Sequence, residues 1–347
     1  MKCLLAIGLA AWFGLSAFGL GCAKPLREVH VYVSDDCRIK PELVARFEKD
    51  YQCRVSIDAS ESEEAVIAKL KAGTGDYDLM IASSDQVRIM FQDGLLHGLR
   101  RELLPNLRHI DPVYQNGAID PRMDHSVPYR LTYTGLAYRR SRVPNCGPTW
   151  AMFDRPDLKD RAIMLNDMRE VIGAALKFLG FSLNTTNVSE LAQARDVAAH
   201  WKKNLARFDS GLYRARLDAG AWWLAQGRSG DIVQLQKDNA DVAFLLPIEG
   251  FSIAGDDLVI PNGAQHAELA HALINFLHIP SVAAENTEFM QYLCPNQSSY
   301  SLLSADIRDN PAVFPGADLL ARGEVVHDLG ANNARYARIW AEIKGAE

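Results

Sequence analysis

The segment Asn166-Asp-Met-Arg-Glu170 places two carboxylates, Asp167 and Glu170, three residues apart. Residues 162–165 before it are apolar and predict a strand, and a helical pattern begins at about Arg169. The pair therefore falls where a strand ends and a helix begins, which is the edge of an open α/β sheet at which ligands bind. A helix N-terminus favours anions, so both acids can be held there in fixed positions.

The same spacing has a structural alternative, because Asp-x-x-Glu is also a capping box in which Asp167 is the N-cap and Glu170 reaches back. A ligand-binding role is favoured by further acids at comparable strand ends: Asp35, Asp36, Asp85, Asp231 and Asp256. Many carboxylates that converge on one crevice indicate a cationic ligand.

The composition is that of a globular protein with room for two domains: 347 residues, 48% hydrophobic and 23% charged. The net charge is −6 at pH 7, and no basic stripe is present that could follow a phosphate backbone. Composition therefore argues against a nucleic-acid partner.

The N-terminus has the pattern of an export signal. One lysine precedes an apolar run over 4–20, which ends in Gly19-Leu-Gly-Cys22. This predicts a signal peptide over 1–21 rather than a membrane span. Cys22 directly after a small residue resembles a bacterial lipoprotein box, which implies an acylated Cys22, a tether over 22–26 and a location at the outer side of a membrane. A secreted protein cleaved nearby and an uncleaved anchor are the alternatives.

The cysteines and histidines do not predict a metal or cofactor site. Cys37 is expected beyond the end of the first strand and Cys53 at the start of the second, on opposite edges of a parallel sheet, so we expect them not to pair. No Cys-x-x-Cys pair and no histidine cluster has the spacing of metal ligands.

Strands and helices alternate along the chain in two series. In the first series, strands are expected at 28–33, 53–57 and 77–82, and helices at 41–50 and 63–71. The fully apolar strand at 77–82 is typical of a parallel sheet covered by helices on both faces. A second series runs from 162 to about 247, and a strand at 257–260 precedes a helix at 267–277. The pattern predicts the α/β class.

Residues 127–138 link the two series and are expected to form an interdomain strand. We expect the chain to cross between domains again near 250–257 and near 293–295. Each lobe is then discontinuous in sequence, with the ligand between the lobes. The first lobe is predicted to comprise 27–132 and 257–294, and the second 133–256 and 295–347.

Seven segments follow one another in an order and spacing that are specific together: Val31-Tyr-Val-Ser34-Asp35, Gly75-Asp-Tyr-Asp-Leu-Met-Ile-Ala-Ser83-Ser84, Asp167-Met-Arg-Glu170-Val, Gly227-Arg-Ser-Gly230-Asp231, Asp256-Asp-Leu-Val-Ile-Pro261, Leu273-Ile-Asn-Phe-Leu277 and Tyr292-Leu-Cys-Pro-Asn296. Over essentially all of the mature chain they resemble the spermidine/putrescine-binding proteins of bacterial ABC transporters. The resemblance implies a monomer with the two-lobe, type II periplasmic-binding-protein fold. It also implies that the protein captures a polyamine and delivers it to the transporter's permease subunits.

The resemblance further implies a set of ligand-binding residues: Ser34, Asp35, Asp36, Ser83, Asp85, Asp167, Glu170, Asp231, Asp256 and Tyr292. Asp167 and Glu170 would take one amine, and Asp231 and Asp256 another. Tyr292 would pack against the methylene chain. Such a site suits a polyamine, whose ammonium groups need carboxylates at intervals and apolar surface between them.

Three positions depart from the family pattern. Val33 and Arg228 stand where the family usually has Trp, and Ala254 stands where it usually has an aromatic residue. The aromatic box is thinned, and five aromatic residues are candidates to compensate: Tyr32, Tyr133, Trp222, Trp223 and Phe251. Arg228 either neutralises a surplus carboxylate or indicates a zwitterionic or different ligand.

An exported hydrolase and a ligand-free adhesin of the same fold are the remaining alternatives, beside a binding protein for another cationic or zwitterionic solute. Gly227-Arg-Ser-Gly230 is not a nucleophile elbow, and His266 and His271 lack the spacing of a zinc pair. No Walker-type Gly-x-x-x-x-Gly-Lys is present, so a separate ATPase is expected to drive transport. The sequence predicts a binding protein rather than an enzyme.

Overall fold

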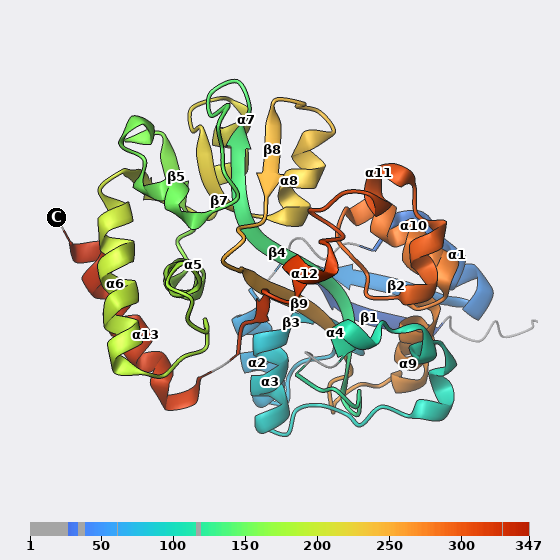
Figure 1. Cartoon of the computed structure of the whole chain (residues 1–347). Helices are drawn as coiled ribbons and strands as arrows, with labels where there is room; N and C mark the ends of the chain where they lie inside the picture. The colour runs from blue at the N-terminus through green and yellow to red at the C-terminus, as the bar shows by residue number, and fades with distance from the viewer. Residues whose placement is uncertain (1–26, 34–38, 61, 116–118, 328, 347) are drawn as a thin grey trace, which may run out of the picture.

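The computed structural model describes residues 27–33, 39–60, 62–115, 119–327 and 329–346. Within these ranges the strands form one mixed sheet in the order β2-β1-β3-β9-β4-β7-β5-β6, with β10 beside β9 and β8 beside β4. Helices pack around both ends of this sheet, and β4 and β9 run between them (Figure 1). The two middle strands therefore join two α/β halves.

The first half is built on three parallel-paired strands and their neighbouring helices. Its strands are β1 (Arg27–Val33), β2 (Cys53–Asp58) and β3 (Leu79–Ser83). Its helices are α1 (Pro41–Tyr51), α2 (Glu63–Lys71), α3 (Ser84–Gln92), α4 (Pro112–Gln115), α9 (Ala267–Leu277) and α10 (Pro280–Met290). As expected, β1 pairs with β2 and β3 in parallel.

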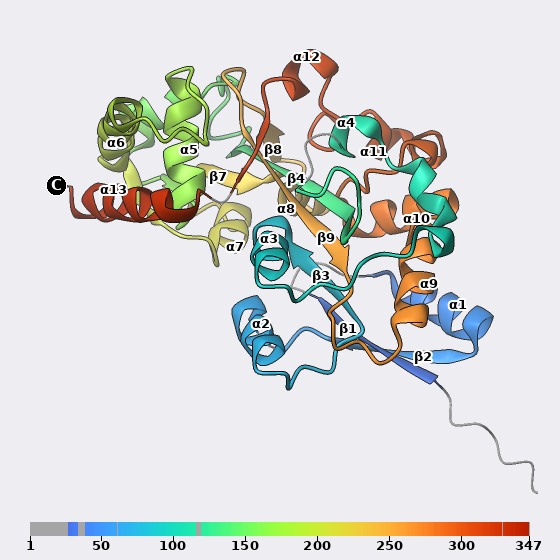
Figure 2. The same ribbon diagram turned by 90° about the horizontal axis from the view of Figure 1, so that it is seen from below.

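Local sequence explains the elements of the first half. Helix α1 has Pro41 at its first position, where the missing N–H is no loss, and it buries Leu43 and Phe47. Strand β3 is buried because helices cover both of its faces. Seen from below, α2 and α3 lie on one side of β1 and β3, and α1, α9 and α10 lie on the other (Figure 2).

The second half continues the same sheet with shorter strands. Its strands are β5 (Ala162–Met164), β6 (Leu205–Phe208), β7 (Leu224–Arg228) and β8 (Val242–Leu245). Its longer helices are α5 (Met168–Phe178), α6 (Val188–Lys202), α7 (Tyr213–Asp218), α8 (Ser229–Gln236) and α13 (Asn333–Gly345). Two short helices precede α13: α11 (Ala305–Arg308), which lies beside α10, and α12 (Ala317–Leu320) (Figure 1). Helix α13 packs on α5 and α6, so the end of the chain returns to this half (Figure 1).

Two long antiparallel strands connect the halves. Strand β4 (Ser126–Arg139) pairs with β9 (Ser252–Val259) through its first part and with β7 and β8 through its second. Strand β9 also pairs with β3 and with β10 (Glu324–Val325). The backbone N–H of Leu131 in β4 donates to the carbonyl of Leu293. Three segments that are far apart in sequence therefore lie side by side between the halves.

The continuity of β9 differs from the sequence expectation, which separated a crossing near 250–257 from a strand at 257–260. The structure has one strand over Ser252–Val259 because this segment pairs on both sides, with β4 and with β3. Asp256 therefore lies inside a strand and not at a strand end. The prediction of its position was wrong.

Several predicted features lie outside the described residues: the signal peptide and tether, Cys22, Cys37, Ser34, Asp35 and Asp36. Among the described residues, no helix combines the length and apolar character needed to cross a membrane. Cys53, Cys146 and Cys294 are free thiols.

Candidate ligand-binding site

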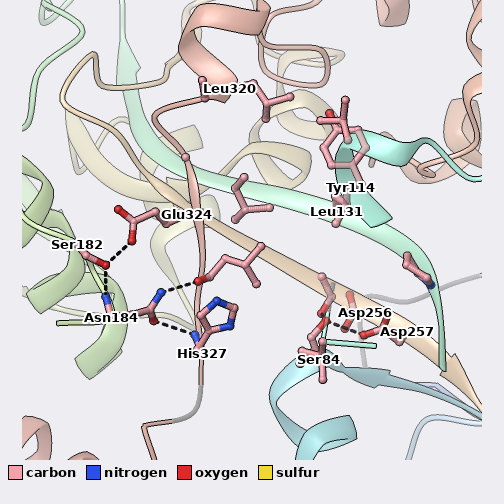
Figure 3. Close-up of a pocket in the computed structure, with 18 of the residues that line it drawn as sticks. Ser84, Tyr114, Leu131, Ser182, Asn184, Asp256, Asp257, Leu320, Glu324 and His327 are labelled. Carbon is pink, nitrogen blue, oxygen red and sulfur yellow. Dashed lines mark hydrogen bonds between the residues drawn. The ribbon is translucent and has the colours of Figure 1, made fainter. Parts of the chain in front are cut away.

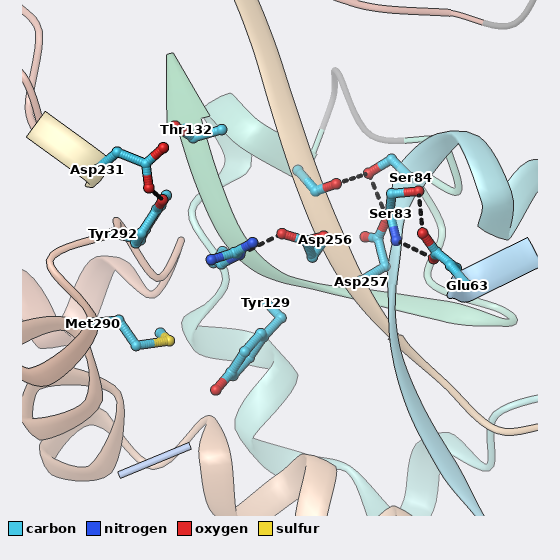
Figure 4. A network of polar contacts seen from close by, with 12 residues as sticks. Glu63, Ser83, Ser84, Tyr129, Thr132, Asp231, Asp256, Asp257, Met290 and Tyr292 are labelled. Atoms are coloured by element: carbon cyan, nitrogen blue, oxygen red, sulfur yellow. Dashed lines mark hydrogen bonds and ion pairs between the residues drawn. The ribbon is translucent and has the colours of Figure 1, made fainter. Parts of the chain in front are cut away.

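One face of the β4–β9 pair is polar where the two halves meet. Arg130 lies directly opposite Asp256 in the ladder, and Thr132 lies opposite Ala254. Because successive strand side chains alternate between faces, Asp256, Ala254 and Ser252 share this face with Arg130 and Thr132. Figure 4 shows Asp256, Thr132 and Tyr292 from β9, β4 and the segment after α10 around one region.

Asp256 is paired with an arginine of the same chain. The Nε of Arg130 donates to Oδ2 of Asp256, and the two side chains are only 10% and 12% exposed. The Arg130 guanidinium also lies over the ring of Tyr292, with 4.4 Å from Cζ to the ring centroid. Arg130 therefore has a carboxylate beside it and an aromatic face below it.

Asp231, in the first turn of α8, is held by neighbouring side chains. The Tyr292 hydroxyl donates to its Oδ1 at 2.7 Å, and the Tyr213 hydroxyl donates to its Oδ2. Arg214 lies 3.6 Å from the same carboxylate. The Tyr292 ring packs directly on Gly230, where a Cβ would be 2.4 Å from ring atoms. Asp231 thus orients Tyr292 at the edge of the site.

Asp167 and Glu170 take different roles. The Asp167 carboxylate accepts from the backbone N–H of Arg169 and of Glu170, so it is the N-cap of α5. Glu170 does not reach back to complete a capping box. It is buried and accepts from the Ser252 hydroxyl at 2.5 Å on the polar face of β9. Burial raises its pKa and Asp167 adds to the rise, while Ser252 and Arg228 oppose it.

Arg228 ends β7 among these acids. Burial lowers the pKa of its guanidinium, but nearby anionic groups, Glu170 foremost, outweigh this effect and raise the pKa overall. Its Nε is buried and has no hydrogen-bond partner among the described residues. Arg228 therefore offsets the charge of Glu170, as one of the two sequence interpretations expected, and retains a donor.

A second acidic group, Glu63 of α2, lies at the end of β3. Ser83 donates through its backbone N–H (2.7 Å) and its hydroxyl (3.0 Å) to the two carboxylate oxygens of Glu63. Burial raises the pKa of Glu63 to about 7, and Asp256 contributes to the rise. Asp85 lies in the first turn of α3. Ser83, Glu63 and Asp256 thus form one cluster, because Ser83 is also the ladder partner of Asp256.

The structure groups most of the predicted residues that it describes. Arg130 contacts both Asp256 and Tyr292, and Tyr292 in turn donates to Asp231. Glu170 lies further along the same side of β9, where it accepts from Ser252. Sequence reasoning did not single out four members of this network: Glu63, Arg130, Tyr213 and Arg214. A signal for Arg130 was present, because it is the only charged residue in 127–138.

The aromatic residues considered as substitutes for the thinned box do not surround this network. Tyr133 and Phe251 are fully buried and pack edge to face, and Tyr32 lies in the core between β1 and α2. Trp222 lies under the guanidinium of Arg207, and Trp223 under those of Arg142 and Arg161.

A cavity of about 710 Å³ lies on the opposite face of the two middle strands. Ile253, Gly255 and Asp257 of β9 line it, with Leu131 of β4. Ser182, Asn184, Glu324 and His327 lie at one end, and Ser84 and Asp257 at the other (Figure 3). Burial raises the pKa of Asp257, which accepts from Ser84 at 2.7 Å, to about 7. This cavity and most of the predicted acids thus lie on different faces, with Asp256 bordering both.

No group of three or more His, Cys, Asp or Glu side chains among the described residues is arranged to hold a metal ion. His271 is buried, and its ring nitrogens contact the Ala267 carbonyl and the Arg100 backbone N–H.

Comparison with known proteins assigns the family. Residues 42–315 match the model of the family described as bacterial extracellular solute-binding protein. The chain belongs to this family. Its relatives include the spermidine/putrescine-binding periplasmic protein of Salmonella typhimurium, 30% identical over 88% of each chain. They also include the putrescine-binding periplasmic protein SpuD of Pseudomonas aeruginosa, 29% identical over all of this chain and 98% of that one.

Solved structures of the family confirm the fold. The spermidine/putrescine substrate-binding protein PotD of Streptococcus pneumoniae superposes with a TM-score of 0.87 at 24% identity, over 92% of this chain and 98% of that one. The TpPotD lipoprotein of Treponema pallidum gives a TM-score of 0.81 at 32% identity, over 91% and 99%. The predicted two-lobe, type II binding-protein fold is confirmed.

Proposed function

We propose that this protein captures a polyamine, such as putrescine or spermidine, between its two halves and delivers it to the permease of an ABC transporter. The carboxylates of Asp256, Glu170 and Glu63, placed along one face of the sheet where the halves meet, carry the proposal. The family and the names of its relatives support it. Each charge-assisted hydrogen bond to an ammonium group contributes roughly 1.5–3 kcal/mol.

A zwitterionic or another cationic solute is the second candidate, and the arginines favour it. Arg130 and Arg228 lie beside Asp256 and Glu170, so a ligand carboxylate would also find donors here. The proposed site comprises the predicted residues Ser34, Asp35, Asp36, Ser83, Asp85, Asp167, Glu170, Asp231, Asp256 and Tyr292. Asp167 and Asp231 act within it mainly by holding α5 and Tyr292.

The two lobes of the proposal follow the sequence division, 27–132 with 257–294 and 133–256 with 295–347. Two hydrophobic clusters on opposite sides of the middle strands support this division, and a third cluster joins second-lobe residues to Ala284 and Leu293 of the first lobe. We infer that bending of β4 and β9 closes the lobes on the ligand, as in other binding proteins of this kind.

Export and anchoring form a further part of the proposal. The apolar run before Cys22 supports a signal peptide over 1–21 and acylation of Cys22, and one solved relative is described as a lipoprotein. The expected location is the outer side of a membrane. Growth with a radiolabelled fatty acid tests this, because Cys22→Ser should abolish labelling and release the protein from the membrane fraction.

Calorimetric titration tests the ligand. The purified protein is titrated with putrescine, spermidine, amino acids and divalent cations. Polyamine binding is expected, and Asp256→Asn should weaken it about ten- to a hundredfold, because the positive charge of Arg130 then loses its carboxylate partner and repels the ligand ammonium. Asp157→Asn is the matched control, since this acid pairs with Arg155 on the surface. The polyamine should be recovered chemically unchanged, and an altered product would instead indicate an enzyme.

A further inference from the structure

Arg130 occupies a place in the site that has the features of an ammonium subsite. Such a subsite needs a carboxylate and an aromatic face, because both stabilise a cation. Asp256 supplies the carboxylate and Tyr292 the face, and the guanidinium of Arg130 already uses both. A cation of the protein thus lies where a ligand ammonium would be expected.

The partners of Arg130 are fixed in place. Asp256 is its ladder partner in the middle of the sheet. The Tyr292 ring is held by the hydrogen bond of its hydroxyl to Asp231 and by contact with Gly230. Because Arg130 is attached to the same chain, it competes with a free ammonium at a high effective concentration. A ligand therefore displaces it only at a large loss of affinity.

The remaining carboxylates define how many amines the site accepts. Each ammonium group that leaves water needs its own anionic partner. Asp256 serves Arg130, and Asp231 serves Tyr292, Tyr213 and Arg214. Among the described acids, Glu170 lies against the beginning of β9 with Arg228 nearby, and Glu63 lies at the end of β3, so these two carboxylates mark the two ends of the polar face. Two ends with one acid each match a ligand with two ammonium groups.

We propose that Arg130 is a specificity-determining residue that fills one amine subsite, so that the protein takes diamines in preference to triamines. The proposal rests on the proposed function and names the ligand class within it. The residue acts by occupying the space and the carboxylate that the middle amine of a longer polyamine requires.

The test compares putrescine with spermidine in calorimetric titrations of the wild type and of variants. The wild type is expected to bind putrescine at least about tenfold more tightly. Arg130→Met should raise the affinity for spermidine about ten- to a hundredfold, because Asp256 becomes available. Arg130→Lys keeps a cation and should keep the diamine preference. Arg155→Met, which removes the arginine of a surface pair, should change neither affinity.

The gain in spermidine affinity of Arg130→Met must depend on Asp256. The double variant Arg130→Met/Asp256→Asn should therefore bind spermidine without this gain. Thermal melts check that each variant is folded, and Arg130→Gln replaces Arg130→Met if the latter does not fold. A wild type that prefers spermidine, or a folded Arg130→Met with an unchanged preference, would overturn the inference and leave polyamine binding intact. Absence of amine binding in every protein would overturn both proposals.

Discussion

Asp256 of β9 and Glu170 of α5 lie on the same side of β9, but their carboxylates contact different groups. Asp256 is paired with a guanidinium in the ladder position opposite to it, whereas Glu170 accepts from the Ser252 hydroxyl and lies near Arg228. The capping interpretation of Glu170 is wrong, because only Asp167 caps the helix. A helix cap therefore does not explain the position of Glu170, whose carboxylate instead faces Ser252 and Arg228 on the polar side of β9.

Glu170→Gln should weaken amine binding about ten- to a hundredfold and leave the fold intact. The physical reason is that Gln retains an acceptor for the Ser252 hydroxyl but carries no charge. Titration with putrescine, together with thermal melts, measures both effects. Asp157→Asn is the control, since this acid pairs with Arg155 on the surface. An unchanged affinity in Glu170→Gln would remove this residue from the site.

The second residue-scale prediction concerns Asp257 on the opposite face. Burial raises its pKa to about 7, so the folded protein holds a proton that the unfolded chain loses above about pH 4. The free energy of unfolding should therefore fall as the pH rises between these values, by at most about 1.4 kcal/mol per pH unit from this group. Asp257→Asn should flatten that dependence in melts from about pH 5 to 8. A wild-type stability that rises over this interval, with the same slope in the variant, would contradict the assignment.

At the scale of the elements, the start of α8 positions Tyr292 through a glycine. The ring lies against Gly230, and its hydroxyl bonds to Asp231 one residue further on. A β-carbon at position 230 would overlap the ring, so the helix can approach Tyr292 only with glycine there. The orientation of the aromatic face under Arg130 depends on this contact.

Gly230→Ala should therefore cost about 1–3 kcal/mol of stability, because the ring must move away. It should also reduce the preference for diamines over triamines, since the displaced Tyr292 no longer holds Arg130 in the amine subsite. Gly173→Ala in α5 is the matched control: its β-carbon would be 3.5 Å from Leu183, an ordinary contact, and helix propensity favours alanine. Chemical denaturation and titration of both variants provide the comparison. Equal stability of the two would show that Tyr292 is not held by Gly230.

The elements of the first half were largely predictable because their signals are local. The apolar strands at 28–33, 53–57 and 77–82 and the helix that begins at Pro41 agree with β1, β2, β3 and α1. The pairing of Arg130 with Asp256 was not predictable, because it joins residues far apart in sequence through the register of β4 and β9. The same non-local pairing made β9 one strand and placed Asp256 within it.

For the whole molecule, the proposed function requires a change of shape. The ligand is expected to bring the two lobes together, with the bend in the strands that connect them. Small-angle X-ray scattering should show a smaller radius of gyration when putrescine is added. Asp256→Asn at the same putrescine concentration should remain at the unliganded value. An unchanged radius at saturating ligand would contradict closure and leave the binding itself to be measured by titration.

The sharing of β4 and β9 by both halves has a consequence for how the protein denatures. Each of these strands is hydrogen-bonded to neighbours in both directions, so neither half can melt without exposing an unpaired strand edge of the other. The hydrophobic clusters of the two halves therefore lose their structure together, although hinged proteins often show one calorimetric transition for each domain. A single heat-absorption peak, with equal calorimetric and van't Hoff enthalpies, follows from this connection. The strands that we propose to bend on closure therefore also make the two lobes one cooperative unit.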